Sequence, residues 1–416
     1  MLTLGAPDSL TLLDRPSPFA SSSAFCCPRR RELHKTGMPT TVHRLTVRQL
    51  ALLDLTPRDL LAWSALEARA AEPNAFLSPH FILPALRHLD PGLRPIVLVV
   101  ERPSGSGSDM VALGVFTSVA ASRVCPLPHL VGYCSRHSFL GGLLVDGDHV
   151  REVVAALHSH ARGRGVGWQV LVLPKLHAGG PLASMLEEQA LGSGFAVHRT
   201  GAQERAILVP GTAGDDALRT ALGKRIKELE RCKRRLMEGG EVSWHCLRQQ
   251  QVDERAVETF LHLEHQGWKA QVKSSLRANP AEEAFFKEVV RGFAGDSRAL
   301  FTELRVDGRA VASTSNFVSG GVGFSFKIGW EAKLRKYGPG LLNEVEFVRA
   351  APEVCADLAW FDSGAHPDSF INHLWTERRE LATMAVPLTA LGDVTLRWSA
   401  RVRRIARRLR SASGDQ

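Results

Sequence analysis

The sequence predicts an α/β protein with two domains. Its 416 residues exceed the size at which a single hydrophobic core usually stops growing, and a hydrophobic content of 44% supports folded domains. Helical and strand patterns alternate between residues 40 and 391. The sharpest pattern is a strand, a glycine-rich turn and a helix within residues 324–351.

This strand–turn–helix segment is predicted from its apolar spacing. Phe324, Phe326 and Ile328 alternate with polar or small residues, which indicates a strand with one buried face. The sequence Tyr-Gly-Pro-Gly at residues 337–340 interrupts that pattern. Apolar residues then recur at helical spacing and predict a helix; they are Leu341, Leu342, Val345 and Val348.

The glycine-rich turn has the features of a pyrophosphate-binding site. The first N–H groups of a helix have no helical acceptor, and glycines let a ligand approach the main chain. An ordinary strand–helix connection is the alternative, because short motifs have a high rate of false matches. The residues expected to bind the cofactor are Phe326, Lys327, Ile328, Tyr337, Gly338, Gly340, Leu341 and Leu342.

The composition argues against several classes of protein. Seven cysteines show neither paired spacing nor the density of a disulfide scaffold, so a reducing cytoplasm is expected. No apolar run approaches the ~18 residues that a membrane span needs. Much of the net charge of +9 comes from seven arginines within residues 397–410. The body of the chain is nearly neutral, so no nucleic-acid partner is expected.

The chain is expected to begin with a disordered extension, residues 1–39, which lacks steady periodicity and is rich in Pro, Ser and Arg. Met38 is a plausible alternative start. A first α/β domain is predicted over residues 40–210. Its expected helices are 59–70, 150–162 and 182–191, and its expected strands are 95–101, 111–120, 168–173 and 195–209.

A second α/β domain is predicted over residues 211–391. It begins with a basic amphipathic helix, residues 218–236, whose cations either cover a solvated face or meet an anionic ligand. A helix over residues 253–267 and a strand pair at 299–306 and 310–318 follow.

The helix over residues 253–267 contains candidate chemical groups. His262 and His265 share one helix face, but no third ligand is evident, so no metal is expected. Glu264 lies one helical turn before Trp268, and a carboxylate beside an indole can act as a base near neutral pH. The alternative is a surface glutamate beside a buried tryptophan.

This order of motifs resembles the GNAT acyltransferase superfamily. Trp268-Lys269, the turn at 338–342 and Asp362-Ser363 look more narrowly like the branch associated with cellulose biosynthesis, distantly related to Fem-type peptidyltransferases. The resemblance covers about residues 40–391. It implies two tandem GNAT-like domains with mixed, mostly antiparallel sheets flanked by helices, of which the first is degenerate and the second catalytic.

The resemblance also implies a function. Acetyl-CoA or another acyl-CoA would be the donor, and an amine or hydroxyl of a polysaccharide precursor or small metabolite would be the acceptor. Trp268 and Lys269 would contact the substrate, and Glu264, Asp362 and His366 would include the group that removes the acceptor's proton. The commonest family form has Tyr-Lys where Phe370-Ile371 stands here, so a lysine at that place is missing.

Direct transfer in a ternary complex needs no protein nucleophile, which agrees with the absence of a G-x-S-x-G motif. Two alternatives stay open at this point: a Fem-type transferase that uses aminoacyl-tRNA, and a scaffold with the same fold but no donor site. The sequence does not choose the acceptor, the acyl chain length, N- or O-transfer, or the oligomeric state.

The last segment, residues 392–416, is predicted to contain an amphipathic helix at about 395–410. Its apolar residues form one narrow stripe, and its seven arginines surround that stripe. We expect peripheral docking at an anionic membrane surface, and the alternative is packing of the stripe on the catalytic domain. The stripe consists of Trp398, Val402, Ile405 and Leu409.

Overall fold

The computed structural model describes residues 45–105, 107–122, 125–163, 167–266 and 271–412, with side chains up to residue 402. The extension predicted at 1–39 and the start at Met38 lie outside this part of the chain.

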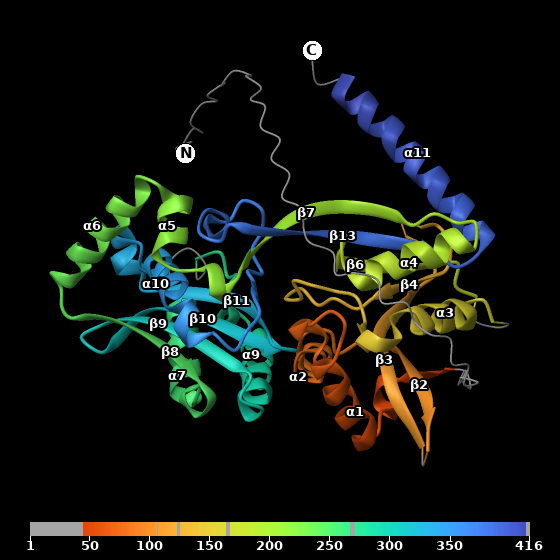
Figure 1. Ribbon diagram of the computed structural model, residues 1–416, viewed down its shortest axis with the longest axis horizontal. Coiled ribbons are helices and arrows are strands. Elements are labelled where there is room, and N and C mark those ends of the chain that lie inside the picture. The colour runs from red at the N-terminus through yellow and green to blue at the C-terminus, as the bar shows by residue number, and fades with distance from the viewer. Residues whose placement is uncertain (1–44, 106, 123–124, 164–166, 267–270, 413–416) are drawn as a thin grey trace, which may run out of the picture. The chain divides into compact units, whose positions relative to one another are not determined.

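The described residues form an α/β fold with one mixed sheet (Figure 1). The strands are β1 Thr46–Ala51, β2 Ile96–Ser104, β3 Gly107–Val119, β4 His129–Gly132, β5 Leu144–Val145, β6 Val170–His177, β7 His198–Leu208, β8 Val242–Arg248, β9 Ala299–Val306, β10 Arg309–Ser319, β11 Val322–Trp330, β12 Phe361–Asp362 and β13 Glu377–Pro387. The helices are α1 Pro57–Ala68, α2 Pro79–Pro84, α3 Val150–Ala161, α4 Pro181–Gly192, α5 Asp215–Leu222, α6 Arg225–Met237, α7 Glu254–Glu264, α9 Pro280–Gly295, α10 Pro339–Val354 and α11 Ala390–Ala412.

The strand order is β1-β2-β3-β4-β6-β13-β7-β12-β11-β10-β9-β8, with β5 beside β3. Two pairs are parallel, β4 with β6 and β11 with β12, and the other pairs are antiparallel. Each parallel step is bridged by a crossover containing a helix, α3 in the first half and α10 in the second. From either end of the sheet, antiparallel and parallel pairs therefore follow one another in the same order. This confirms the expected fold of two similar halves.

The two halves exchange their last strands. Strand β7 ends the first half in sequence but pairs with β12 of the second half, and β13 ends the second half but pairs with β6 of the first. Strands β7 and β13 also pair with each other, and Figure 1 shows them side by side across the molecule. The sheet is therefore continuous. The domain boundaries at residues 210 and 391 remain predictions.

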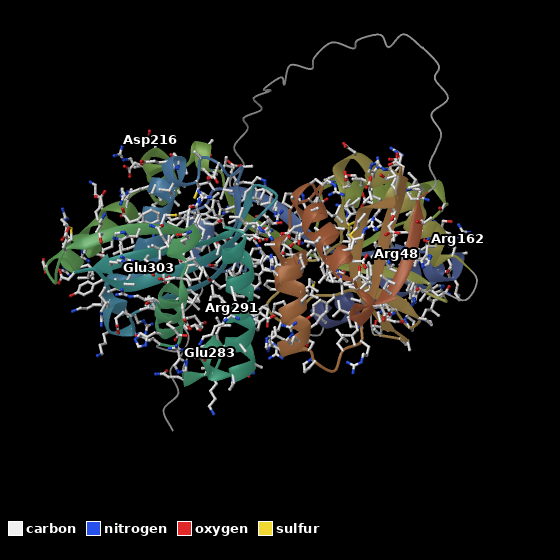
Figure 2. The ribbon with its side chains drawn as sticks, turned by 90° about the horizontal axis from the view of Figure 1, so that it is seen from below. Arg48, Arg162, Asp216, Glu283, Arg291 and Glu303 are labelled. Atoms are coloured by element: carbon white, nitrogen blue, oxygen red, sulfur yellow. The ribbon has the colours of Figure 1, made fainter. Side chains whose placement is uncertain are left out.

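One hydrophobic core also extends across both halves. It contains Phe76 and Phe81 from the first half and Phe285 and Phe324 from the second. The rings of Phe81 and Phe285 lie 5.3 Å apart, and those of Phe76 and Phe324 lie 6.0 Å apart. Helix α9 thus packs against α2, and Figure 2 shows α9 beside the first helices of the chain. Aromatic side chains of both halves therefore pack in one shared core.

The strand, turn and helix predicted within residues 324–351 are present as β11 and α10. Gly338 begins the helix with φ of +62°, a left-handed conformation that favours glycine, and Pro339 takes the first helical position. A Cβ atom on Gly340 would lie 3.1 Å from the Trp330 ring, so this glycine lets α10 approach β11 closely. Local sequence therefore sets both the turn and the helix–strand packing.

The basic helix predicted at residues 218–236 is two helices, α5 and α6. Gly223 separates them with φ of +53°, which interrupts the helical backbone. The apolar stripe continues across the break and packs Leu218, Leu222 and Leu236 into the cores of the second half.

Helix α11 is present as predicted and is attached to the body by its first turns. Leu396 is fully buried beside β6 and β13, and Asp393 accepts a hydrogen bond from the Ala196 N–H at 3.2 Å. Trp398 is 62% exposed and Val402 is 56% exposed. The alternative in which these two residues pack on the body is therefore wrong, while the side chains of Ile405 and Leu409 lie outside the described residues.

Candidate functional site

A cavity opens where β11 and β12 separate. The two strands pair in parallel at only two positions, Gly323 with Phe361 and Phe324 with Asp362. Beyond them a cavity of about 220 Å³ lies between residues 325–328 of β11 and residues 363–365. No described strand pairs with β11 on this side beyond Phe324, so an extended ligand could lie alongside this strand.

The closed end of the cavity depends on a glycine. Gly364 has φ of +61°, and a Cβ atom there would lie 2.4 Å from the Ser325 carbonyl oxygen and 2.7 Å from the Phe139 ring. A larger residue would therefore clash with β11. Phe139 belongs to the loop between β4 and β5, so the first half contributes one wall of this cavity.

The opposite wall carries an acidic side chain, Glu344 of α10. The Thr314 hydroxyl of β10 donates to Glu344 Oε1 at 2.5 Å, and no hydrogen bond among the described residues reaches Oε2. Only 2% of Glu344 is exposed. Burial raises the pKa of Glu344 to about 7, although the Thr314 hydrogen bond acts in the opposite direction.

A chain of hydrogen bonds sets the direction of the Thr314 hydroxyl. Trp244 Nε1 can only donate, and it donates to Asn343 Oδ1 at 3.0 Å, which identifies the amide nitrogen of Asn343. That nitrogen donates to Thr314 Oγ1 at 3.1 Å and to Thr302 Oγ1 at 3.0 Å. Thr314 therefore directs its own proton to Glu344, which holds the carboxyl group in one orientation.

Cations lie around the same site. Lys327 lines the cavity, with its ammonium 5.7 Å from the centroid of the Phe326 ring. Lys333, Arg335 and Lys336 lie on the short 3₁₀ helix Ala332–Tyr337 that precedes α10, and all three are exposed. These exposed cations could attract a phosphate group to the N-terminus of α10.

The N-terminus of α10 has main-chain donors available. Its first helical hydrogen bond runs from the Leu342 N–H to the Gly338 carbonyl at 2.9 Å, and Pro339 has no N–H. The N–H groups of Gly340 and Leu341 are therefore left without a helical acceptor. A Cβ atom on Gly340 would lie 3.4 Å from Ile328 Cδ1, so the turn adjoins the end of the cavity.

The predicted cofactor residues fall into two groups. Phe326, Lys327 and Ile328 line the cavity. Tyr337, Gly338, Gly340, Leu341 and Leu342 are not among its lining residues and instead form the adjoining turn and first helical turn. The side chain of Leu342 is buried in the core, so its contribution to a ligand is limited to its main chain.

The three predicted proton-transfer residues occupy different surroundings. Glu264 is buried and accepts a hydrogen bond from the Leu276 N–H at 2.9 Å. The side chain of His366 is 76% exposed and lies 3.3 Å from Asp368. Asp362 is fully buried and holds two arginines, Arg205 at 2.9 Å and Arg379. None of the three is among the residues that line the cavity.

Glu344 and Thr314 were missed by reasoning from sequence. A signal was present, because Glu344 takes a position on the apolar face of α10, three residues after Leu341 and four before Val348. A charged residue at such a position is buried in the folded chain and needs a polar partner. Thr314 gives no comparable signal in a strand where Ser and Thr recur.

The predicted substrate residues Trp268 and Lys269 lie outside the described residues. Within the described residues, no group of three or more His, Cys, Asp or Glu side chains could hold a metal ion. No helix in the same part of the chain is long and apolar enough to cross a membrane.

A known protein family matches the part of the chain that carries most of this site. Residues 223–370 match the family described as an acetyltransferase (GNAT) domain. This segment has a GNAT fold. The match covers β8 to β12, α10 and most of the residues that line the cavity, while Phe139, Ile371 and Trp375 lie outside it. No curated protein matches the chain.

Solved structures align with most of the chain. FemX aligns with a TM-score of 0.52 at 11% identity, over 82% of this chain and 97% of FemX. A conserved protein of unknown function from Bacteroides thetaiotaomicron aligns with a TM-score of 0.48 at 13% identity, over 80% and 98% of the two chains. A tandem GNAT protein from the clavulanic acid biosynthesis pathway has a TM-score of 0.39 at 15% identity, over 83% and 99%. At these identities the likeness concerns the fold.

Proposed function

We propose that this protein transfers an acyl group from acyl-CoA to an amine or hydroxyl of a small acceptor, such as a polysaccharide precursor. The observation that carries the proposal is the separation of β11 and β12 around a cavity within the GNAT fold. An extended chain with amide groups, such as the pantetheine arm of CoA, could lie alongside β11. The donor would therefore lie along residues 325–328.

The size of the cavity supports this arrangement. A cavity of about 220 Å³ gives room for an acyl thioester and the reacting group of an acceptor. The phosphates would lie outside, at the N-terminus of α10 and its neighbouring cations, where helix N–H groups favour anions.

Direct transfer needs the two substrates to be held together rather than a protein nucleophile. The cavity is lined by Ser325 and Ser363 and has no cysteine among its lining residues. The thioester carbon and the acceptor would meet between β11 and residues 363–365, with Phe139 excluding water from one side.

Binding of acetyl-CoA is expected to depend on the cations beside α10. Replacing Arg335 and Lys336 together with glutamate should weaken acetyl-CoA binding at least tenfold, because hydrogen bonds to charged groups contribute about 1.5–3 kcal/mol each. Isothermal titration calorimetry at low salt measures this affinity. These exposed sites are cleaner tests than Gly340→Asp, because a side chain at Gly340 would also press on Trp330.

The matched control is Arg162→Glu, which changes an exposed arginine after α3 (Figure 2). It should leave the affinity for acetyl-CoA unchanged. Failure of the unaltered protein to bind acetyl-CoA would contradict the proposed function. Binding of aminoacyl-tRNA in its place would support the Fem-type alternative.

Peripheral membrane contact through α11 is a second part of the proposal. Leu391, Val394, Trp398 and Val402 are each more than half exposed along one helix. Arginines flank this stripe in the sequence. An apolar stripe with flanking cations suits an anionic lipid surface, where each engaged cation contributes about 1 kcal/mol.

Sedimentation with phosphatidylserine-containing vesicles tests this contact. The full chain should sediment with the vesicles at low salt, and Trp398→Glu with Val402→Glu should abolish sedimentation. Leu53→Glu is the control, because Leu53 is 91% exposed in the first half. Equal sedimentation of the α11 double variant and the unaltered chain would rule out docking through this stripe.

A further inference from the structure

The position of Glu344 gives it a role that none of the comparisons assigns. It is the acidic side chain of the cavity wall, facing the space between β11 and residues 363–365. One carboxyl oxygen is held by Thr314, and the other has no hydrogen-bond partner among the described residues. Glu344 Oε2 is not among the fully buried described atoms that lack a partner, which agrees with an oxygen that is open to the cavity.

We propose that Glu344 is the group that removes the acceptor's proton during acyl transfer. This inference rests on the proposed function and adds the residue that performs the chemistry. The acceptor's nitrogen or oxygen forms a bond to the thioester carbonyl carbon while its proton passes to Glu344 Oε2. The C–S bond then breaks, and the CoA thiolate leaves and takes that proton from the Glu344 carboxyl group.

The surroundings of Glu344 suit a base that works near neutral pH. A base is most effective when its pKa lies near the working pH, and burial gives Glu344 such a value. Lys327 is the other charged residue that lines the cavity. Behind Ser363, Asp362 is held by Arg205 and Arg379. The elements packed on α10 otherwise present the neutral groups of Thr302, Thr314 and Trp244 to this network.

The Thr314–Asn343–Trp244 chain gives the carboxyl group a fixed direction. Thr314 holds Oε1, which leaves Oε2 as the carboxyl oxygen available to a group in the cavity that Glu344 lines. Thr314 is therefore a positioning residue, and it also stabilises the ionised form of Glu344 by donating a hydrogen bond. Loss of this hydroxyl should move the titration of Glu344 to higher pH.

The first experiment compares Glu344→Gln with the unaltered protein. Glutamine keeps the size of the side chain and can still accept from Thr314. CoA release from acetyl-CoA, with glucosamine as the acceptor probe, should fall at least 100-fold, since a general base typically contributes 10²–10⁴-fold. Calorimetry should give an acetyl-CoA affinity within about threefold of the unaltered protein, because the variant removes no donor to the CoA. Glu353→Gln, an exposed site on the same helix, is the control.

The second experiment follows the carboxyl group itself and needs no acceptor. Difference infrared spectroscopy should show the absorption band of a protonated carboxyl group that disappears as the pH rises through about 7. This band should be absent in Glu344→Gln. The midpoint of this titration should move to higher pH in Thr314→Val and should lie again near pH 7 in Thr314→Ser. The inference is overturned if no such band titrates between pH 6 and 8, or if Glu344→Gln releases CoA at the unaltered rate. Absence of acetyl-CoA binding in the unaltered protein would instead contradict the proposed function.

Discussion

Replacing Asp362 with alanine should lower the free energy of unfolding by about 3–5 kcal/mol, because removal of one partner leaves buried charges without compensation. The side chain of Asp362 is fully buried, and the side chains of Arg205 and Arg379 are 4% and 10% exposed. Asp362 also accepts from the Gly364 N–H at 2.7 Å. The substitution therefore frees two guanidinium groups and one main-chain donor at the edge of the cavity.

Urea denaturation followed by fluorescence or circular dichroism measures this loss. Asp368→Ala is the matched control, because Asp368 lies on the following loop with its side chain 92% exposed. It should change the unfolding free energy by no more than about 0.5 kcal/mol. A loss below 1 kcal/mol in Asp362→Ala would mean that the two arginines are not held by this carboxylate.

Glu344 should make the stability of the protein depend on pH. Its pKa is about 7 in the folded chain and near 4.5 in an exposed chain, a difference that corresponds to about 3 kcal/mol. Below pH 4.5 the group is protonated in both states and its contribution is fully present. Between these two pH values Glu344 is ionised in the unfolded chain but still protonated in the folded chain. Its contribution to stability is therefore lost as the pH rises through about 7.

The unfolding free energies of the unaltered protein and Glu344→Gln isolate this effect, since other groups titrate alike in both. We compare the difference in unfolding free energy between the variant and the unaltered protein at two pH values. This difference should be about 3 kcal/mol more in favour of the variant at about pH 8 than at about pH 4. A difference that is constant with pH would show that Glu344 titrates at its ordinary value. Glu353→Gln should show no such trend, because Glu353 is exposed.

The fold was predictable where the decisive interactions are local. Alternating apolar residues in β9, β10 and β11 and helical spacing in α7 and α10 indicated those elements. Strand β13 and strand β8 were not predicted, although both have ordinary strand lengths. The exchange of β7 and β13 was also beyond prediction, since these pairings join residues more than 150 positions apart.

The sequence by itself determined the strand, turn and helix of residues 322–354, because each depends on near neighbours: alternation in β11, the left-handed backbone of Gly338 and the first helical position of Pro339. Only the tertiary structure decided where the cavity lies, since it exists because β12 leaves β11 after Asp362 and Phe139 closes one side. Only that arrangement makes Glu344 a buried carboxyl group beside an open space. Burial and the dielectric around a charge come from residues distant in the chain, and a sequence pattern does not contain them.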